Sequence, residues 1–529
     1  MILLIRALLF SLLALTVFGQ NNGNFSLSTK ENQFSIAAGT SAASALQMKA
    51  IAGYSQPVYL IPGALPEGIS VTIPSPVVGS QEVKLQVRAA VDVKPQTYAL
   101  TVYAAGAGEN HSISFSLTVL PAGTAPSLKP EIASTPVKLK PAERPEDKPQ
   151  IGSHWVASWG SSAVIPSNDN GAYYLTNVTI REIAHLSIGT QTGIRIRLSN
   201  ALGKDSVSFG AVHVAQWAGD AKTVTSAILP ATDQVVTFCG STTIVIPGGE
   251  EVFSDPIPMP LPAGADLAVS IFVQRTSNVP ATMHQFGNQT SYFSLGDATV
   301  STTFSNALTD SVRPYLTGID VDTPGAMAVV ALGDSLTDGM LSTRDQNLRW
   351  PDDLARRLQD SGADRLAVVN EGIAGNCMLI NCMGPNITDR FKRDVLSIPG
   401  VKYLILLAGA NDIGHAPDLA AAQLTDAYRS MVSLAHQNNI LVYGATIPPF
   451  GGSNYFSAKH EKIRQDVNDF IRNGKVFDGV IDFDRALADQ KNPTYLRAQY
   501  NGDKIRPNDA GYQAMADSID LGLFNSNPR

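Results

Sequence analysis

Hydrophobic and polar residues alternate in the first 120 residues, and this pattern predicts short β-strands. Between 111 and 119, Ile113, Phe115, Leu117 and Val119 fall on one face of an extended chain, and serine and threonine residues fall on the other. Similar runs, separated by turn residues, cover 58–61, 70–73, 82–89 and 97–104. Strands repeating about every ten residues over about a hundred residues are typical of a β-sandwich, which we expect over 20–120.

Seven prolines interleaved with charged residues occupy 121–150. This composition cannot form a packed core and predicts an extended linker. Alternating β-type runs return between 151 and 323. They cover 178–186, 193–198, 206–215, 242–246 and 265–273. We therefore expect a second β-domain, of jelly-roll type, over 151–323.

A different pattern begins near residue 324, where continuous apolar runs alternate with helical segments. The apolar runs cover 326–335, 365–372, 402–412, 440–449 and 476–483, and the helical patterns cover 352–362, 424–439 and 462–474. Continuous apolar strands between helices predict a parallel sheet covered on both faces. The chain is thus expected to be multidomain, with two β-sandwich or jelly-roll-like domains before a doubly wound α/β domain over 324–529. Functional residues of such a sheet lie at the carboxyl ends of its strands.

Composition and charge narrow the possible partners. A chain of 529 residues exceeds the size of one hydrophobic core, and 44% hydrophobic with 16% charged residues is typical of globular proteins. The net charge of −7 supplies no basic field for nucleic acid or an anionic membrane. A neutral or weakly polar substrate suits this surface better, and nothing in the sequence indicates a particular oligomeric state.

Residues 1–19 have the pattern of a secretory signal peptide. Arg6 precedes an apolar run that ends at Phe18, and Val17 and Gly19 form a small-residue cleavage site. The run is shorter than the roughly 20 residues of a membrane span. We expect a secreted or periplasmic protein without a membrane span after cleavage; the alternative is an uncleaved N-terminal anchor.

The chain has three cysteines, Cys239, Cys377 and Cys382. Cys377 and Cys382 are close enough to clip one loop by a disulfide, which export permits but does not require. A metal site is not expected, because the three scattered cysteines lack neighbouring histidine pairs. The sequence also implies no organic cofactor.

Four sequence blocks carry candidate chemistry at the predicted strand ends. Ser335 follows the first strand in Gly-Asp-Ser-Leu, where a tight turn can present its hydroxyl. Gly375 follows the second strand and lets a backbone N–H approach a developing oxyanion. Asn411 follows the third strand and offers an amide donor. The last block runs from Asp503 to Arg506 and continues with Pro507.

These four blocks, in this order, resemble the SGNH/GDSL hydrolases. The resemblance covers about 324–529 and implies a flavodoxin-like sheet and a serine esterase. The segments HWVASWG, GIRIRLSNALG and PAGADLAVSIFV resemble the β-domain that precedes the hydrolase in a bacterial subgroup including xylanase-associated esterases. The segments PEGISVTIPSP and YALTVYA loosely resemble immunoglobulin-like domains of bacterial secreted proteins.

The resemblance assigns Ser335 as nucleophile and Asp503 as the acid of the triad. It places the oxyanion hole at the backbone N–H groups of Ser335 and Gly375 and the side chain of Asn411. In the family the last block is Asp-x-x-His before proline, whereas Arg506 occupies the histidine position here. A guanidinium has only donors and cannot take the serine proton, so Arg506 is expected to form an ion pair with Asp503.

Four accounts of this departure remain open. His415 could serve as a substitute base, or Asp503 or a bound water could act directly. The domain could be a pseudoenzyme, or the arginine could be an inactivating change. The other histidines are interpreted as structural, although His284 could line a cleft between domains.

Three acidic residues near the blocks have predicted structural roles. Asp334 is expected to bond backbone around the nucleophile turn, and Asp412 and Asp509 to cap helix starts. The sequence therefore predicts a secreted esterase acting through a Ser335 acyl-enzyme on small acyl esters or acetylated polysaccharide. The alternative is a catalytically impaired carbohydrate-binding or adhesion protein.

Overall fold

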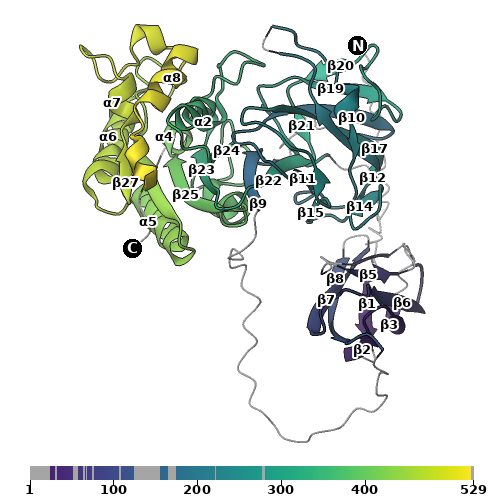
Figure 1. Cartoon of the computed structure of the whole chain (residues 1–529). Helices are drawn as coiled ribbons and strands as arrows, with labels where there is room; N and C mark the ends of the chain where they lie inside the picture. The colour runs from purple at the N-terminus through teal and green to yellow at the C-terminus, as the bar shows by residue number, and fades with distance from the viewer. Residues whose placement is uncertain are drawn as a thin grey trace, which may run out of the picture. The chain divides into compact units, whose positions relative to one another are not determined.

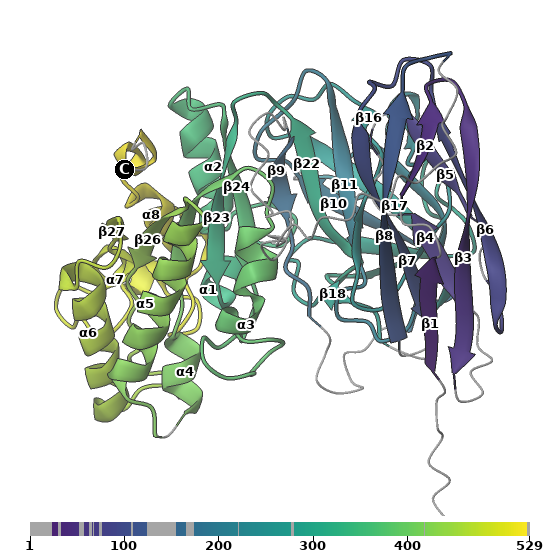
Figure 2. The ribbon, with the colours of Figure 1, turned by 90° about the horizontal axis from the view of Figure 1, so that it is seen from below.

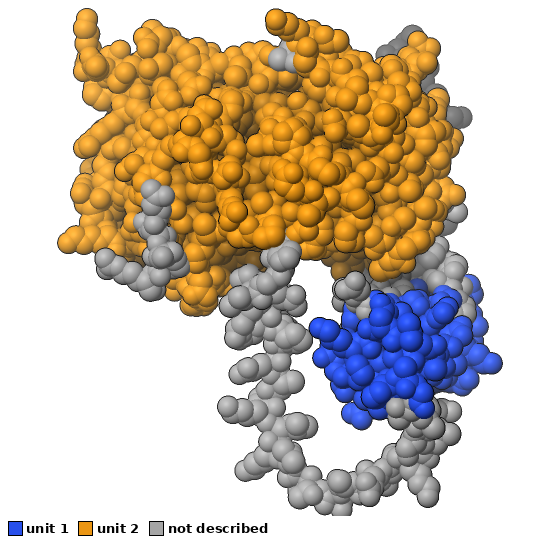
Figure 3. Space-filling model, in the orientation of Figure 1, with its two compact units in different colours: residues 1–133 blue, residues 134–529 orange. Residues whose placement is uncertain are grey.

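The chain contains two compact units, residues 1–133 and 134–529 (Figure 3). The computed structural model describes residues 24–29, 33–51, 58–62, 66, 68–73, 77–106, 109–123, 155–164, 174–220, 222–276, 280–416 and 418–525. The predicted signal peptide and residues 124–150 of the predicted linker lie outside these residues. Within them, no helix combines the length and apolar character needed to cross a bilayer.

The first unit is a β-sandwich, as the alternating pattern predicted. One sheet has the order β1-β3-β6-β5 and the other β2-β8-β7-β4. The strands are β1 (Asn24–Thr29), β2 (Gln33–Ala37), β3 (Ser41–Ile51), β4 (Tyr59–Pro62), β5 (Ile69–Thr72), β6 (Gln81–Ala89), β7 (Thr97–Gly106) and β8 (Glu109–Leu120). Phe115, Leu117 and Val119 of β8 are buried in the core between the sheets. The period-two pattern thus identified the inward face of this strand correctly.

The second unit begins with two further β-sheets (Figure 1). One has the order β13-β12-β17-β10-β19-β20 with β14 beside β12, and the other β15-β11-β22-β9 with β16 beside β11. The strands are β9 (Trp155–Gly160), β10 (Val178–His185), β11 (Gly193–Ser199), β12 (Val207–Gln216), β13 (Gln234–Val235), β14 (Ile244–Ile246), β15 (Glu251–Phe253), β16 (Ile257–Pro258), β17 (Asp266–Thr276), β19 (Ser291–Leu295), β20 (Leu308–Asp310) and β22 (Leu316–Asp322). A short ladder joins β18 (Met283–His284) to β21 (Arg313–Pro314). We refer to residues 155–322 as the β-region.

A five-stranded parallel sheet follows, in the order β24-β23-β25-β26-β27. Its strands are β23 (Met327–Gly333), β24 (Leu366–Gly372), β25 (Val401–Leu407), β26 (Leu441–Ala445) and β27 (Gly479–Ile481). Numbered along the chain, this order is 2-1-3-4-5, which is the flavodoxin-like arrangement. The switch in strand order therefore falls at β23, the strand that leads into Ser335.

Helices cover both faces of this sheet (Figures 1 and 2). On one face pack α2 (Trp350–Asp360), α7 (Phe483–Leu487) and α8 (Asp509–Asp517), and on the other α3 (Ile387–Phe391), α5 (Ala421–Gln437) and α6 (Ala458–Asn473). Along β23, Val329 and Ala331 face the first set, whereas Val330 and Leu332 face the second. Burial on both faces explains why these strands are continuous apolar runs.

The β-region covers the outer edge of β24. The backbone N–H of Val368 donates to Ser187 Oγ at 3.0 Å, which satisfies a donor that an edge strand would leave unpaired. Ala157 N of β9 donates to Pro399 O at 3.0 Å. A Cβ at Gly160 would collide with the side chains of Val369 and Glu371, so this approach of β9 requires glycine. The β-region and the α/β region thus share one interface, and the boundary at 323–324 stays a prediction.

Candidate active site

Three strand ends meet at one edge of the parallel sheet. Gly333 of β23 pairs with Gly372 of β24 and with Leu407 of β25. The next residues of these three segments lead to Ser335, Gly375 and Asn411, respectively. Parallel register therefore brings the three predicted blocks to the same rim of the sheet.

Ser335 opens the short helix α1 (Ser335–Asp338) and is 7% exposed. Asp334 caps this helix, as predicted, by accepting the Leu336 N–H at 2.9 Å. Burial raises the pKa of Asp334 to about 7. The Tyr512 hydroxyl of α8 donates to Met340 O at 2.7 Å and lies 3.4 Å from Ser335 O, so α8 holds the far end of the turn.

The loop after β24 turns sharply over the nucleophile turn. Gly375 has φ +77°, a conformation that favours glycine. Ile373 N donates to Gly333 O at 3.1 Å, and Ala374 N donates to Asp338 Oδ2 at 2.8 Å. The residues on either side of Ser335 therefore fix the loop that carries Gly375.

Asn411 lies in α4 (Ala410–His415) with its amide held at both ends. Its Nδ2 donates to Asn376 O at 2.8 Å, and the Tyr455 hydroxyl donates to its Oδ1 at 2.9 Å. The second N–H of the Asn411 amide has no acceptor among the described residues. Among the described residues, the backbone N–H groups of Ser335 and Gly375 also donate to no acceptor, and the Ser335 hydroxyl has no hydrogen-bond partner.

Arg390 of α3 is a fully buried centre of hydrogen bonding behind this rim. Its guanidinium donates to Gly333 O and Glu371 O, each at 2.8 Å, and to Asn376 Oδ1 at 2.9 Å. It also pairs with Asp394 at 2.9 Å. One side chain thus ties together the ends of β23 and β24 and the loop after Gly375.

The Cys377–Cys382 disulfide is formed and closes the next loop. Asp412 accepts the N–H groups of Met378 at 2.7 Å and Leu379 at 2.9 Å. Its predicted capping role is therefore wrong, because its carboxylate ties α4 to this loop.

Asp509 also does not cap its helix. Its carboxylate accepts the Thr343 N–H at 2.7 Å, and Asn508 caps α8 by accepting the Gly511 N–H at 3.0 Å. Asp509 therefore joins the start of α8 to the segment after α1.

Asp503 and Arg506 form the expected ion pair, with 2.7 Å between Asp503 Oδ2 and Arg506 Nη2. Asp503 Oδ1 accepts the N–H groups of Ile505 at 3.1 Å and Arg506 at 2.8 Å. The Arg506 guanidinium also contacts the sulfur of Met340, the second residue after α1. The last block therefore reaches the nucleophile turn, and both carboxylate oxygens of Asp503 are engaged.

His415 ends α4, and its Nδ1 lies 2.8 Å from Asn411 O. Its ring also lies against Tyr455, with 5.2 Å between ring centroids. A ligand atom of His415 and the sulfurs of Cys377 and Cys382 lie within 4.8 Å of one another, but the disulfide occupies both sulfurs. No hydrogen bond joins His415 to Ser335 among the described residues.

The four blocks did not reveal the residues that fix the site's donors. Arg390, Asp338, Tyr455 and Tyr512 all lie outside the motif cores or at positions without a characteristic spacing. For Arg390 a signal existed, because it follows the apolar Ile387 by three residues and so falls on the helix face that packs inward, where an arginine is unusual. The contacts of Tyr455 required the fold, because 44 residues separate it from Asn411.

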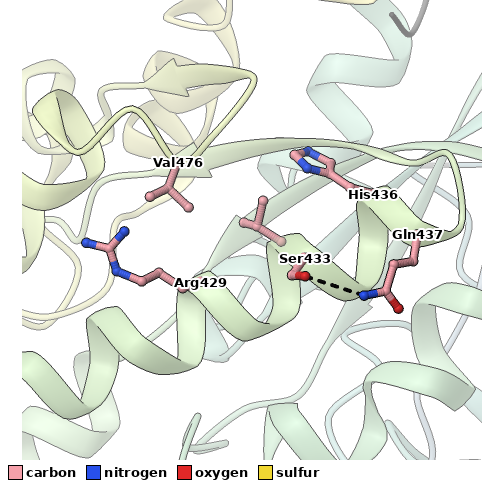
Figure 4. Close-up of a pocket in the computed structure, with 6 residues that line it drawn as sticks. Arg429, Ser433, His436, Gln437 and Val476 are labelled. Atoms are coloured by element: carbon pink, nitrogen blue, oxygen red, sulfur yellow. Dashed lines mark hydrogen bonds between the residues drawn. The ribbon is translucent and has the colours of Figure 1, made fainter.

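A surface hollow lies away from this rim (Figure 4). It is lined mainly by the second half of α5, including Arg429, Ser433, His436 and Gln437, together with Val476. The His436 imidazole bonds Asp478, which also accepts the Val442 N–H near the start of β26. The hollow thus lies at the amino ends of the strands, opposite the candidate active site.

The family model described as GDSL-like Lipase/Acylhydrolase family matches residues 331–514. Residues 331–514 thus form a GDSL-like lipase/acylhydrolase domain. This finding confirms the resemblance drawn from the four blocks, and it covers the parallel sheet and the rim just described. No curated protein matches the chain in sequence.

Several solved structures are similar to the GDSL domain. The lipase/acylhydrolase from Enterococcus faecalis is 20% identical, with 38% of this chain and 98% of that chain covered and a TM-score of 0.31. A GDSL-like lipase from Bacteroides thetaiotaomicron is 18% identical, with 37% and 88% covered and a TM-score of 0.29. A catalytic mutant of an acetylxylan esterase from Geobacillus stearothermophilus is 17% identical, with 36% and 91% covered and a TM-score of 0.30.

Proposed function

We propose that the protein is a secreted serine esterase whose acyl-enzyme forms on Ser335. One observation carries the proposal: the N–H groups of Ser335 and Gly375 and one amide N–H of Asn411 are uncommitted at one rim, beside an unpaired serine hydroxyl. Buried donors are normally satisfied within the protein or by water. Three open donors around a nucleophile suit an oxyanion that forms only during reaction.

In this mechanism, Ser335 Oγ bonds to the ester carbonyl carbon, and the negative charge moves to the carbonyl oxygen. The three donors stabilise that oxygen. The alkoxide then leaves with a proton, and water releases the acyl group. The Ser335 proton needs an acceptor, since an unassisted serine hydroxyl is a poor nucleophile. Arg506 cannot fill that role, and its ion pair occupies Asp503.

His415 is the proposed substitute base. It is carried on the same helix as Asn411, and its Nε2 remains available because Nδ1 faces the Asn411 carbonyl. A carbonyl oxygen only accepts, so Nδ1 holds the proton and Nε2 carries the lone pair in the neutral ring. The mechanism requires that His415 Nε2 come within hydrogen-bond reach of Ser335 Oγ.

Acetylated polysaccharide is the proposed substrate. Phe456 and Tyr495 are 38% and 41% exposed, with ring centroids 6.5 Å apart. Tyr455, beside Phe456, bonds Asn411, and a Cβ at Gly452 would lie 2.9 Å from Tyr495 and 3.8 Å from Lys504. The exposed rings thus border the site, where the apolar face of a sugar could stack on them.

The second candidate is a carbohydrate-binding pseudoenzyme. The Asp503–Arg506 ion pair favours it, because this pair takes the place of an acid–base couple. Loss of a triad histidine costs about 10⁶ in turnover in a well-studied serine protease.

Hydrolysis of an activated acetate ester separates these functions. The proposal expects turnover in the native chain that Ser335→Ala and His415→Gln both abolish. Turnover that is absent until Arg506→His is introduced would support the pseudoenzyme or an inactivating change to arginine. If Arg506→His is also inert, the hydrolase interpretation of this rim is wrong.

A further inference from the structure

His284 of β18 is a buried histidine whose two ring nitrogens both face hydrogen-bond acceptors. Nδ1 lies 2.7 Å from Ser162 O, and Nε2 lies 3.0 Å from Asp338 Oδ1. A carbonyl oxygen and a carboxylate oxygen only accept, so both nitrogens must carry a proton. With Asp338 ionised, the geometry holds an imidazolium paired with a carboxylate, and each side chain is less than 10% exposed.

The charge balance around His284 agrees with this protonation state. Burial opposes the charged ring, but the attraction of Asp338, its hydrogen bond and that of the Ser162 carbonyl together raise the pKa of His284 above its usual value. Other charged or titratable groups also act on the pair. Arg313 of β21 acts on both members, and Arg349 before α2 and Tyr512 of α8 act on Asp338.

Asp338 carries this contact onward to the proposed oxyanion hole. It is the last residue of α1, which begins with Ser335. Its second oxygen, Oδ2, accepts the Ala374 N–H at 2.8 Å, and Ala374 directly precedes Gly375. A hydrogen-bonded path of two side chains thus leads from the β-region to the backbone N–H one residue before the Gly375 donor.

We propose that His284 is a positioning residue for acyl transfer, through which the β-region sets the Gly375 donor. The inference rests on the proposed function. Charged His284 fixes the Asp338 carboxylate, and the fixed carboxylate orients the 374–375 segment. Deprotonation of His284 at high pH removes one donor and the charge of the pair, so the loop loses its anchor in the alkaline range.

Two substitutions separate positioning by charge from mere packing. His284→Leu removes both donors and leaves Asp338 without its partner. Asp338→Asn instead allows a neutral equivalent: the amide oxygen accepts the Ala374 N–H, and the amide nitrogen donates to Nε2 of neutral His284. All three hydrogen bonds then survive without any charge. His213→Leu is the matched control, because His213 pairs with Asp233 at 3.0 Å within the β-region.

The first readout is the rate of acetate ester hydrolysis as a function of pH. The parent for these variants is the native chain or Arg506→His, whichever hydrolyses the ester. We expect His284→Leu to lower kcat at least about tenfold with KM changed less, since removal of one oxyanion donor costs about 10²–10³ in kcat. Asp338→Asn should keep kcat within about threefold and lose the alkaline decline of the parent. Equal effects on kcat and KM, or an unchanged alkaline decline in Asp338→Asn, would overturn the inference.

The second readout does not depend on activity. Amide hydrogen exchange of the 372–378 segment should accelerate at least about tenfold in His284→Leu and remain near the parent rate in Asp338→Asn and His213→Leu. Unchanged exchange in His284→Leu would overturn the inference even in an inactive chain. Failure of the proposed function is recognised by a separate result: neither the native chain nor Arg506→His shows hydrolysis that depends on Ser335.

Discussion

Replacement of Arg390 by methionine should destabilise the second unit strongly. Arg390 is fully buried, and its guanidinium donates to Gly333 O, Glu371 O and Asn376 Oδ1 besides pairing with Asp394. Arg390→Met keeps an unbranched side chain in the same space but removes every donor. Five buried acceptors, including Ser162 Oγ at 3.0 Å from the guanidinium, then lose a partner, and Asp394 loses half of its compensating charge.

The magnitude follows from the partners that remain. Breaking a buried ion pair by removing one member costs about 3–5 kcal/mol. Arg393 still pairs with Asp394 at 2.5 Å, so we expect the lower end, about 3 kcal/mol in the free energy of unfolding. The donation to Gly333 O also anchors the strand that leads into Ser335, so turnover should fall with stability.

Urea unfolding followed by tryptophan fluorescence measures this loss. All four tryptophans, Trp155, Trp159, Trp217 and Trp350, lie in the second unit, so the signal does not report on the first. Arg485→Met is the control, because Arg485 is 79% exposed and lies 3.3 Å from Asp482. We expect its effect to stay below about 0.5 kcal/mol. A change below about 1 kcal/mol in Arg390→Met would refute the reasoning from buried hydrogen bonds.

Three further predictions follow from the same contacts. The pKa of Asp334 is about 7 in the folded chain against an ordinary value of 3.8, so folded Asp334 keeps its proton where the unfolded chain has lost it. Its contribution to stability is therefore present below pH 3.8 and is lost as pH rises to 7, at about 1.4 kcal/mol per pH unit. The free energy of unfolding of Asp334→Asn, compared with that of the native chain, should therefore be higher at pH 8 than at pH 5. Equal differences from urea unfolding at both pH values would contradict this. Replacing Cys377 and Cys382 together by serine should lower the free energy of unfolding by about 2 kcal/mol, from the chain entropy of a short closed loop, and an unchanged urea midpoint would exclude that contribution. Phe456→Ala and Tyr495→Ala should slow release of acetate from acetylated xylan but not hydrolysis of a small acetate ester; equal losses on both substrates would argue against a sugar platform.

The fold could be predicted from the sequence where burial leaves a periodic trace. The run 326–335 became β23, and the run 365–372 became β24, because both faces of these strands are covered. The short strand β18, with only two residues, has no period to detect. It nevertheless supplies His284, which the sequence analysis interprets as structural, with a place lining a cleft between domains as the alternative.

The site could be predicted at its strand ends but not in its supporting contacts. Ser335, Gly375 and Asn411 follow strands whose register the parallel sheet fixes. By contrast, Asp412 was expected to cap a helix and instead binds the loop after Cys377. A carboxylate near a helix start can satisfy its own helix or a distant loop, and only the packed chain decides between them.

The central claim, that Ser335 lies in an assembled acyl site with Arg506 in place of the expected imidazole, can be tested without a natural substrate. Intact-mass spectrometry can follow phosphonylation of the native chain, Ser335→Ala and Arg506→His by an activated phosphonate ester. The account predicts one adduct per chain on Ser335 in Arg506→His, forming at least about 10³ times faster than in Ser335→Ala. If Arg506→His remains as unreactive as Ser335→Ala while both stay folded, the donors and the hydroxyl do not form one site and the account is wrong.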